Sequence, residues 1–130
     1  VNNLVGRQDR MRYNAIPGVV YTNPEVAGVG ETEESAKAKG ITYKMAKLPM
    51  SYSGRFVAEN EGGNGLCKVL VGEKYGEVIG VHLLGNPSSE IIYGACMAIE
   101  QEMTVKELQE VVFPHPTVSE IIKETIFSFD

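Results

Sequence analysis

The sequence predicts an α+β domain with a mostly antiparallel sheet flanked by helices. Segments with the residue pattern of β-strands come in an order that allows hairpins, and the segments with helical patterns are grouped mainly towards the end of the chain. The length of 130 residues fits one domain that can bury a hydrophobic core without disulfides or metals.

Five segments are predicted to be strands. Residues 18–22 and 25–30 are short runs of β-branched and small residues separated by the turn signal Asn23-Pro24. Residues 41–48 alternate loosely and end at Pro49, which indicates a position near an edge of the sheet. Residues 66–71 and 77–84 form two further runs, and the glycine-flanked residues 72–76 between them predict a hairpin connection.

The predicted helices begin at recognisable capping residues. Thr32 precedes a helix over 33–39 with acids in its first turn, lysine in its last and Gly40 as its stop. Thr104 precedes a second short helix over 105–112. The spacing of Thr117 and Glu120 is that of a capping box, ahead of a helix over 118–127.

Two further regions are assigned by composition and periodicity. Residues 50–65 are rich in glycine, serine and asparagine and are expected to be mostly loop. Asn86 and Pro87 have the order of a cap followed by a proline at the first helical position, so a helix is expected from there to Glu100. Its apolar residues cover a broad surface, which predicts burial on more than one side.

Composition excludes several classes of function. Seventeen acidic residues against twelve lysines and arginines give a net charge of -5, which argues against a nucleic-acid partner. No apolar stretch approaches the roughly 20 residues of a membrane span, and no signal peptide is visible. Cys67 and Cys96 form no close pair, so reduced thiols and a cytoplasmic location are expected. With two histidines and two unpaired cysteines, no metal site is supported.

The feature most indicative of chemistry is His115, which lies between Pro114 and Pro116 directly ahead of a helix. Each proline fixes its own φ and restricts the residue before it, so the backbone at the histidine is held at little conformational cost. A general base that must meet a substrate at a fixed geometry requires a backbone restricted in this way. Glu120 is close enough in the sequence to accept a bond from the imidazole and set its tautomer. From the residues alone, a turn residue and a catalytic residue remain equally open readings of His115, and helix capping is the favoured reading of Glu120.

Other polar residues have structural explanations. His82 lies in the middle of a strand, where packing is the usual role. Gly28 and Gly30 lack the third glycine and the acid of a dinucleotide fingerprint. A self-contained hydrolase built on His115 with Ser119 or Ser89 has little support, because no glycines of a nucleophile elbow surround either serine and nothing supplies an oxyanion hole. The sequence therefore encodes no complete active site.

Several motifs in the correct order resemble the interface domain of the dihydrolipoyl dehydrogenases, members of the pyridine nucleotide-disulfide oxidoreductase family. YTNPEVAGVGETEESAKAKG is similar to the opening of that domain, with its T-x-P-E-x-A-x-V-G-x-T-E signature. GRFVAENEGGNGLCKVLV and GEVIGVHLLG resemble its middle strands, and HPTVSE resembles its closing His-Pro-Thr-x-Ser-Glu motif. The resemblance runs from about Tyr13 to the end of the chain.

The resemblance implies a mostly antiparallel fold that forms the homodimer contact of a larger oxidoreductase, a flavoprotein that uses FAD and NAD. It implies that His115 acts across the two-fold axis at the redox-active center of the other subunit and removes a proton from a dihydrolipoyl thiol, while Glu120 orients the ring. It also implies that the backbone of His115 and Pro116 lies near the flavin of the other subunit. The implied partner is the lipoyl domain of a 2-oxo acid dehydrogenase or glycine cleavage complex.

The sequence also departs from the family pattern. Val-Phe-Pro precedes the closing motif where many members carry His-Ala, and Pro114 is expected to shift the approach of this loop to the flavin. The FAD-binding and NAD-binding motifs and the C-x-x-x-x-C pair are not in these 130 residues. Residues 1–13 are therefore expected to be the remnant of a preceding FAD domain or linker, residues 14–130 the dimerisation domain, and the chain alone inactive. The alternatives are a standalone binding or dimerisation module of the same fold, and another disulfide reductase such as glutathione reductase.

Overall fold

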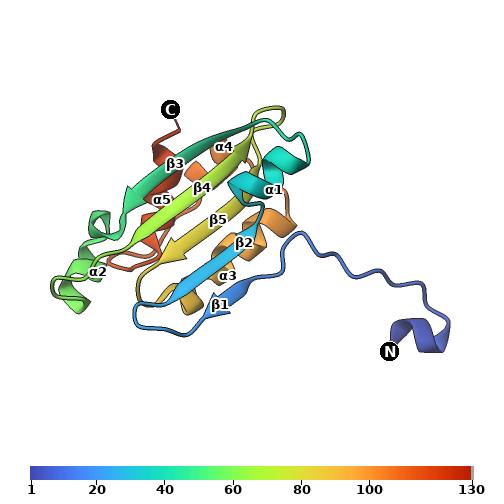
Figure 1. The fold of residues 1–130 in the computed structure, drawn as a ribbon, viewed down its shortest axis with the longest axis horizontal. Coiled ribbons are helices and arrows are strands. Elements are labelled where there is room, and N and C mark those ends of the chain that lie inside the picture. The colour runs from blue at the N-terminus through green and yellow to red at the C-terminus, as the bar shows by residue number, and fades with distance from the viewer. Residues whose placement is uncertain (130) are drawn as a thin grey trace.

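The computed structural model describes residues 1–129, which are built around one five-stranded antiparallel sheet (Figure 1). The strands lie in the order β1-β2-β5-β4-β3, so β1 and β3 are the edges and the β4–β5 hairpin is near the middle. The α+β class, the antiparallel pairing and the edge position of the third strand are confirmed. The strands are β1 (Gly18–Val20), β2 (Val26–Gly30), β3 (Tyr43–Pro49), β4 (Leu66–Gly72) and β5 (Val78–Leu84).

The main helices cover one face of the sheet. α3 (Ser88–Glu100) packs against β2 and β5, and α5 (Glu120–Phe127) packs against β4 and β3. Figure 1 shows α3, α4 (Val105–Gln109) and α5 behind the sheet and α1 (Glu33–Ala38) in front of it. Within residues 1–129 no helix is both long and apolar enough to cross a bilayer.

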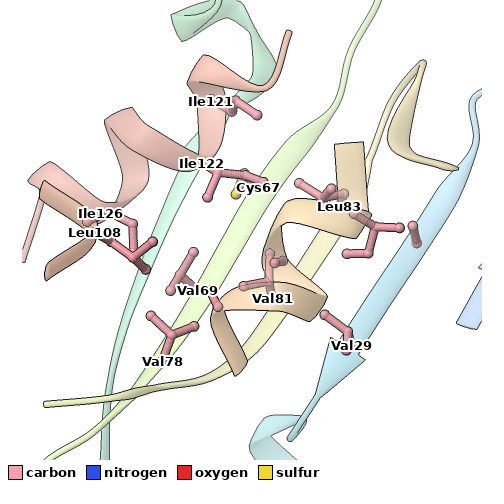
Figure 2. Packing of buried hydrophobic residues seen from close by; sticks show 14 of the residues in the cluster. Val29, Cys67, Val69, Val78, Val81, Leu83, Leu108, Ile121, Ile122 and Ile126 are labelled. Atoms are coloured by element: carbon pink, nitrogen blue, oxygen red, sulfur yellow. The ribbon is translucent and has the colours of Figure 1, made fainter. Parts of the chain in front are cut away.

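The hydrophobic core fills the space between the sheet and these helices (Figure 2). Alternate residues of the strands point into it, as expected of a sheet with one covered face. The buried side chains include Val29, Cys67, Val69, Val81, Leu83, Ile92, Ile121 and Ile126. This core fixes the start of α5, and with it the segment that carries His115.

The capping predictions for the two short helices are confirmed. The hydroxyl of Thr32 accepts a hydrogen bond from the backbone of Ser35, and α1 begins at Glu33. Thr104 and Glu107 form the reciprocal bonds of a capping box at the start of α4. Satisfying these backbone donors locally explains why both helix starts can be read from the sequence.

The expectation that residues 50–65 are mostly loop is wrong for the first half of the segment. A 3-10 helix, η2 (Met50–Tyr52), is followed by α2 (Gly54–Glu59). The Ser53 hydroxyl accepts the backbone N–H of Phe56 at 3.2 Å, and the side chains of Met50 and Phe56 are buried in the core. Burial of these two residues stabilises a short helix that the polar composition conceals.

The expected cap at Asn86 is also wrong. α3 begins at Ser88, and the residue at its N-cap position is Pro87. No side-chain hydrogen bond runs from this residue to the first turn of the helix. The Asn86 side chain instead accepts the backbone N–H of Glu25 at 2.9 Å and donates to Asn23 at 3.0 Å. It therefore ties the start of α3 to the turn between β1 and β2.

The expected burial of α3 on more than one side is not found in the single chain. Ile92, Ala95 and Ile99 face the core, whereas Tyr93 and Met97 are exposed.

The N-terminal segment is also largely exposed: it starts with the 3-10 helix η1 (Asn2–Val5) and extends away from the sheet in Figure 1. Arg12 forms an ion pair with Glu100 at the end of α3.

Candidate functional site

His115 lies in the exposed connection between α4 and α5. Phe113 before it and Val118 after it pack against the core, and Ile121 in the first turn of α5 is fully buried. The residues between these anchors, Pro114 to Pro116, are exposed. The imidazole itself is 80% exposed, so the fold holds the two ends of the connection and presents the ring to solvent.

Glu120 contacts the ring from inside the fold. Its Oε1 and Oε2 atoms lie 3.0 and 3.1 Å from Nδ1 of His115, and its side chain is only 11% exposed. Oε2 also accepts the backbone N–H of Thr117 at 2.9 Å. One carboxylate thus binds both the ring and the main chain two residues after it.

The carboxylate of Glu120 is ionised under ordinary conditions. Its pKa is lowered from the ordinary value of 4.5, first by the Thr117 backbone N–H and then by the hydrogen bond with His115. Lys123 adds a further favourable contact 3.5 Å from Oε1, and its own ammonium lies 3.0 Å from Glu124. An ionised carboxylate only accepts hydrogen bonds, so Nδ1 of His115 carries the proton that faces it.

This arrangement leaves Nε2 as the free nitrogen of the ring. Within residues 1–129 it has no hydrogen-bond partner, and in the neutral imidazole it bears the lone pair. A neutral ring so oriented can accept a proton at Nε2. The site is therefore suited to general acid–base work on a group brought by another molecule.

The capping-box prediction for this segment is half right. Glu120 accepts the Thr117 N–H as the acid of a capping box does, but the Thr117 hydroxyl donates to the Pro114 carbonyl at 2.7 Å and contacts Ser119 at 2.8 Å. α5 begins at Glu120, two residues later than expected. The turn reading and the proton-transfer reading of Glu120 are compatible, because its two oxygens serve the main chain and the ring together.

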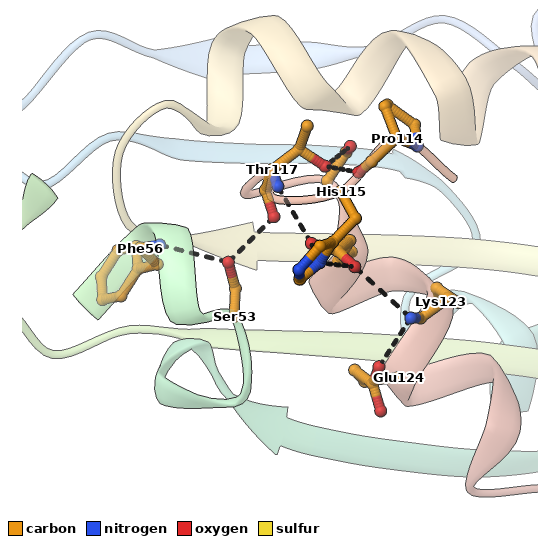
Figure 3. A network of polar contacts seen from close by, with 9 residues as sticks. Ser53, Phe56, Pro114, His115, Thr117, Lys123 and Glu124 are labelled. Atoms are coloured by element: carbon orange, nitrogen blue, oxygen red, sulfur yellow. Dashed lines mark hydrogen bonds and ion pairs between the residues drawn. The ribbon is translucent and has the colours of Figure 1, made fainter. Parts of the chain in front are cut away.

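Ser53 and Lys123 belong to the same polar network and are not singled out by the sequence. The Ser53 hydroxyl donates to the carbonyl of Thr117 at 3.0 Å (Figure 3). The i, i+3 spacing of Glu120 and Lys123 on one helix is a signal for their contact. Nothing in the sequence signals the Ser53 contact, because the two residues are 64 positions apart.

The other candidates lie outside this network. His82 Nε2 is 2.9 Å from the carbonyl oxygen of Glu31, which is a structural contact between β5 and the end of β2. Both cysteines are free, and Cys67 is buried. Neither Ser89 nor Ser119 has a hydrogen bond to His115 in the described chain, which leaves the hydrolase reading without a nucleophile. Among residues 1–129 no cluster of three or more histidine, cysteine or acidic side chains could hold a metal.

The chain matches a known family over most of its length. Residues 16–126 match the pyridine nucleotide-disulphide oxidoreductase dimerisation domain. Dihydrolipoyl dehydrogenase 3 of Pseudomonas putida is 38% identical over 130 residues, which are all of this chain and 28% of that protein. The mitochondrial dihydrolipoyl dehydrogenase of Pisum sativum is 37% identical over 95% of this chain and 25% of its own length. The chain thus spans about a quarter of these curated relatives.

Solved structures agree with this assignment. The HOCl-induced flavoprotein disulfide reductase RclA from Escherichia coli superimposes with a TM-score of 0.87 at 26% identity, covering 99% of this chain and 30% of that one. LpdA from Mycobacterium tuberculosis has the same fold, with a TM-score of 0.87 at 24% identity over 99% of this chain and 28% of its own. By sequence and by fold, the chain belongs to the dimerisation-domain family of the pyridine nucleotide-disulphide oxidoreductases.

Proposed function

We propose that this chain is the dimerisation domain of a dihydrolipoyl dehydrogenase and that His115 and Glu120 are its acid–base pair. The observation that carries the proposal is the 80% exposed ring of His115, whose Nδ1 is held by an ionised, largely buried carboxylate. A base that serves only its own chain has no need for such exposure. The curated relatives named above as dihydrolipoyl dehydrogenases support the choice of substrate class.

The reaction starts with a proton transfer to the ring. Nε2 of His115 takes the proton of a dihydrolipoyl thiol, and the thiolate attacks a disulfide of the partner subunit. That disulfide breaks, a mixed disulfide forms, and one enzyme thiolate is released. The ring passes this proton to the released enzyme thiolate, and Nε2 then takes the proton of the second substrate thiol. The second substrate thiolate breaks the mixed disulfide and closes the lipoyl disulfide, so two electrons remain on the enzyme's cysteine pair. Throughout, Glu120 keeps Nδ1 protonated and stabilises the charged ring.

The redox-active disulfide has to come from outside this chain. Cys67 is buried and Cys96 is far from it in the sequence, and neither is part of a closely spaced pair. We therefore propose a homodimer in which His115 of one subunit meets the cysteine pair of its partner. Exposed apolar side chains on α3, Tyr93 and Met97, provide a surface for the contact between subunits.

FAD and NAD are proposed for the whole enzyme and would carry the electrons onward from the cysteine pair. The residues present here fit a backbone contact with the flavin of the partner subunit, since Pro114, His115 and Pro116 form an exposed connection. They do not fit a complete dinucleotide site, because Gly28 and Gly30 are both paired within β2, and the third glycine and the acid of the fingerprint are not in the sequence. On this proposal, the backbone of His115 and Pro116 supplies that contact, while the His115 ring remains the acid–base group.

The remaining features of the proposal concern the setting of the domain. Residues 1–13 are assigned to the preceding domain or linker. This is consistent with the structure, in which all of these residues are exposed. The proposed substrate is the lipoyl domain of a 2-oxo acid dehydrogenase or glycine cleavage complex, and the reduced cysteines favour a cytoplasmic location. A glutathione reductase and a standalone module of this fold are the alternatives.

Replacing His115 with glutamine in the protein that carries this chain tests the proposal. Turnover of dihydrolipoamide with NAD should fall by about 10²–10⁴-fold, the usual contribution of a positioned general base. The melting temperature should stay close to that of the parent, because the ring is mostly exposed. If the parent protein turns over glutathione disulfide in place of dihydrolipoamide, a glutathione reductase is favoured. Near-normal dihydrolipoamide turnover in His115→Gln would rule out the role of His115 as the base.

A further inference from the structure

A buried serine joins the connection that carries His115 to a distant part of the chain. The Ser53 hydroxyl donates to the carbonyl of Thr117 at 3.0 Å, and the two residues are 64 positions apart. The same hydroxyl accepts the backbone N–H of Phe56 at 3.2 Å. Ser53 is only 1% exposed, so both of its hydrogen bonds are made inside the protein and neither can be replaced by water without a change in the structure.

The carbonyl that Ser53 holds is next to the group that orients Glu120. The N–H of Thr117 donates to Oε2 of Glu120 at 2.9 Å and is the leading cause of that acid's lowered pKa. The N–H and the carbonyl flank the same Cα atom. Holding the carbonyl therefore limits rotation at Thr117 and fixes the direction of its N–H.

The segment that carries Ser53 is itself held in place by the hydrophobic core. Ser53 follows η2, whose Met50 is fully buried and donates its backbone N–H to Gly65 at 3.0 Å. Phe56 in α2 is also buried in the core. The exposed residues 114–116 have no such packing, so their position depends on the bonds made at Pro114 and Thr117.

We infer that Ser53 is a positioning residue for the acid–base pair. Its hydroxyl fixes Thr117, Thr117 fixes the Glu120 carboxylate, and the carboxylate fixes the tautomer and direction of the His115 ring. Ser53 contacts neither the ring nor a substrate. Because its effect on turnover passes through His115, this role rests on the proposed function, but its effect on the ring can be measured separately.

The test uses the protein that carries this chain, with Ser53→Ala, Ser53→Thr and a matched control, Thr104→Ala. Thr104 also caps a short helix through its hydroxyl, accepting the N–H of Glu107 at 3.3 Å, and it takes no part in the His115 network. Each alanine variant loses a capping bond and one further bond of its hydroxyl, which for Thr104 is the 2.8 Å bond to Oε2 of Glu107. The melting temperature should fall in both variants, and further in Ser53→Ala because Ser53 is buried. Only Ser53→Ala also loses the bond to Thr117, and Ser53→Thr retains a hydroxyl.

Two measurements decide the role of Ser53. The kcat for dihydrolipoamide should fall about tenfold in Ser53→Ala, since small displacements of a catalytic group are costly, while the KM for NAD stays unchanged. It should recover in Ser53→Thr and stay at the parent value in Thr104→Ala. Nitrogen-15 NMR of the histidine side chains, assigned with His115→Gln, should show a protonated Nδ1 at His115 in the parent and a mixture of tautomers in Ser53→Ala.

The outcomes separate the two proposals. Parent-like kcat and an unchanged His115 tautomer in Ser53→Ala would overturn the positioning role, as would an equal fall of kcat in Thr104→Ala. If His115→Gln itself keeps full turnover, the proposed function fails. The tautomer measurement then decides alone whether Ser53 orients the ring, because it does not depend on catalysis.

Discussion

Glu120 binds Nδ1 of His115 with both carboxylate oxygens, at 3.0 and 3.1 Å, while the two side chains have opposite relations to solvent. The acid is 11% exposed and the ring 80% exposed. The orienting group is therefore part of the folded structure and the oriented group is accessible from outside. This separation allows the chain to hold a base rigidly and still present it to a second molecule.

Replacing Glu120 with glutamine should impair turnover as strongly as loss of the base. The amide oxygen would remain with the Thr117 N–H, so the NH₂ group would face Nδ1 of His115. Donation from that group favours the tautomer with the proton on Nε2, which cannot accept a proton from a thiol. We expect kcat to fall about 10²–10⁴-fold.

Glu120→Ala is the comparison for this effect. It removes the orienting carboxylate but does not impose the wrong tautomer on His115. Turnover in Glu120→Gln should be no higher than in Glu120→Ala, although glutamine has nearly the shape of the natural residue. A glutamine variant with close to normal turnover would show that the tautomer of His115 does not matter for the reaction.

The same carboxylate should make the stability of the chain sensitive to acid. The pKa of Glu120 is lowered in the folded state, chiefly by the Thr117 N–H, so its ionised form stabilises the fold. That contribution is complete above the ordinary value of 4.5 and is lost as the pH falls through the lowered pKa. Urea unfolding between about pH 5 and pH 3 should show a smaller loss of stability in Glu120→Gln than in the parent. Identical pH dependence in both proteins would contradict the hydrogen-bonded, ionised state of Glu120.

Gly28 should be intolerant of a side chain because of the histidine opposite it. A Cβ at position 28 would lie 2.7 Å from Nδ1 of His82, and the ring is held by the 2.9 Å contact of Nε2 with the Glu31 carbonyl. Gly28→Ala is therefore expected to destabilise the chain by about 1–3 kcal/mol in denaturant unfolding.

Gly18 provides a matched control for Gly28. It lies in β1 with nothing within 4 Å of an added Cβ, so Gly18→Ala should leave stability unchanged or slightly raised. Truncating the ring should relieve the clash, so Gly28→Ala should cost less in a His82→Ala background than alone. Equal costs at positions 18 and 28 would show that the close approach of His82 is unimportant.

The features predicted correctly from the sequence depend on residues close to one another along the chain. Thr32 and Thr104 bind backbone groups three residues later, and His115 and Glu120 are five residues apart. The alternation within the strands likewise needs only neighbouring residues and one covered face. Such local patterns specify hydrogen bonds and periodicity without knowledge of the rest of the fold.

The features that were missed depend on contacts between distant segments. Ser53 and Asn86 have partners 61 to 64 positions away, and these partners decide their roles. Asn86 has the residue type of a helix cap, yet its side chain binds Glu25 and Asn23. The helix at Gly54–Glu59 depends on burying Phe56 beneath a polar surface. No rule based on residue type and spacing can anticipate these pairings.

The two cysteines should differ in their reaction with thiol reagents. Cys67 is fully buried, and burial raises its pKa to about 12. Cys96 is partly exposed, with a pKa raised by desolvation. Because the thiolate is the reactive form, folded chain near pH 8 should leave Cys67 unmodified and label Cys96 slowly, whereas unfolded chain should label both. Cys96→Ser should abolish labelling of the folded chain, and fast labelling of Cys67 would contradict its burial.

The exposed side chains of α3 should be required for self-association. Tyr93 is 68% exposed although it follows the buried Ile92 on a helix that packs against the sheet. Tyr75, in the turn between β4 and β5, is 67% exposed and serves as a control of equal exposure. If the proposed dimer forms through α3, Tyr93→Asp should raise the dimer Kd at least about tenfold, because a charge would replace an aromatic side chain in the contact. Sedimentation of the protein that carries this chain would show the shift towards monomer, and Tyr75→Asp should sediment like the parent. Equal behaviour of the two variants would place the subunit contact elsewhere on the domain.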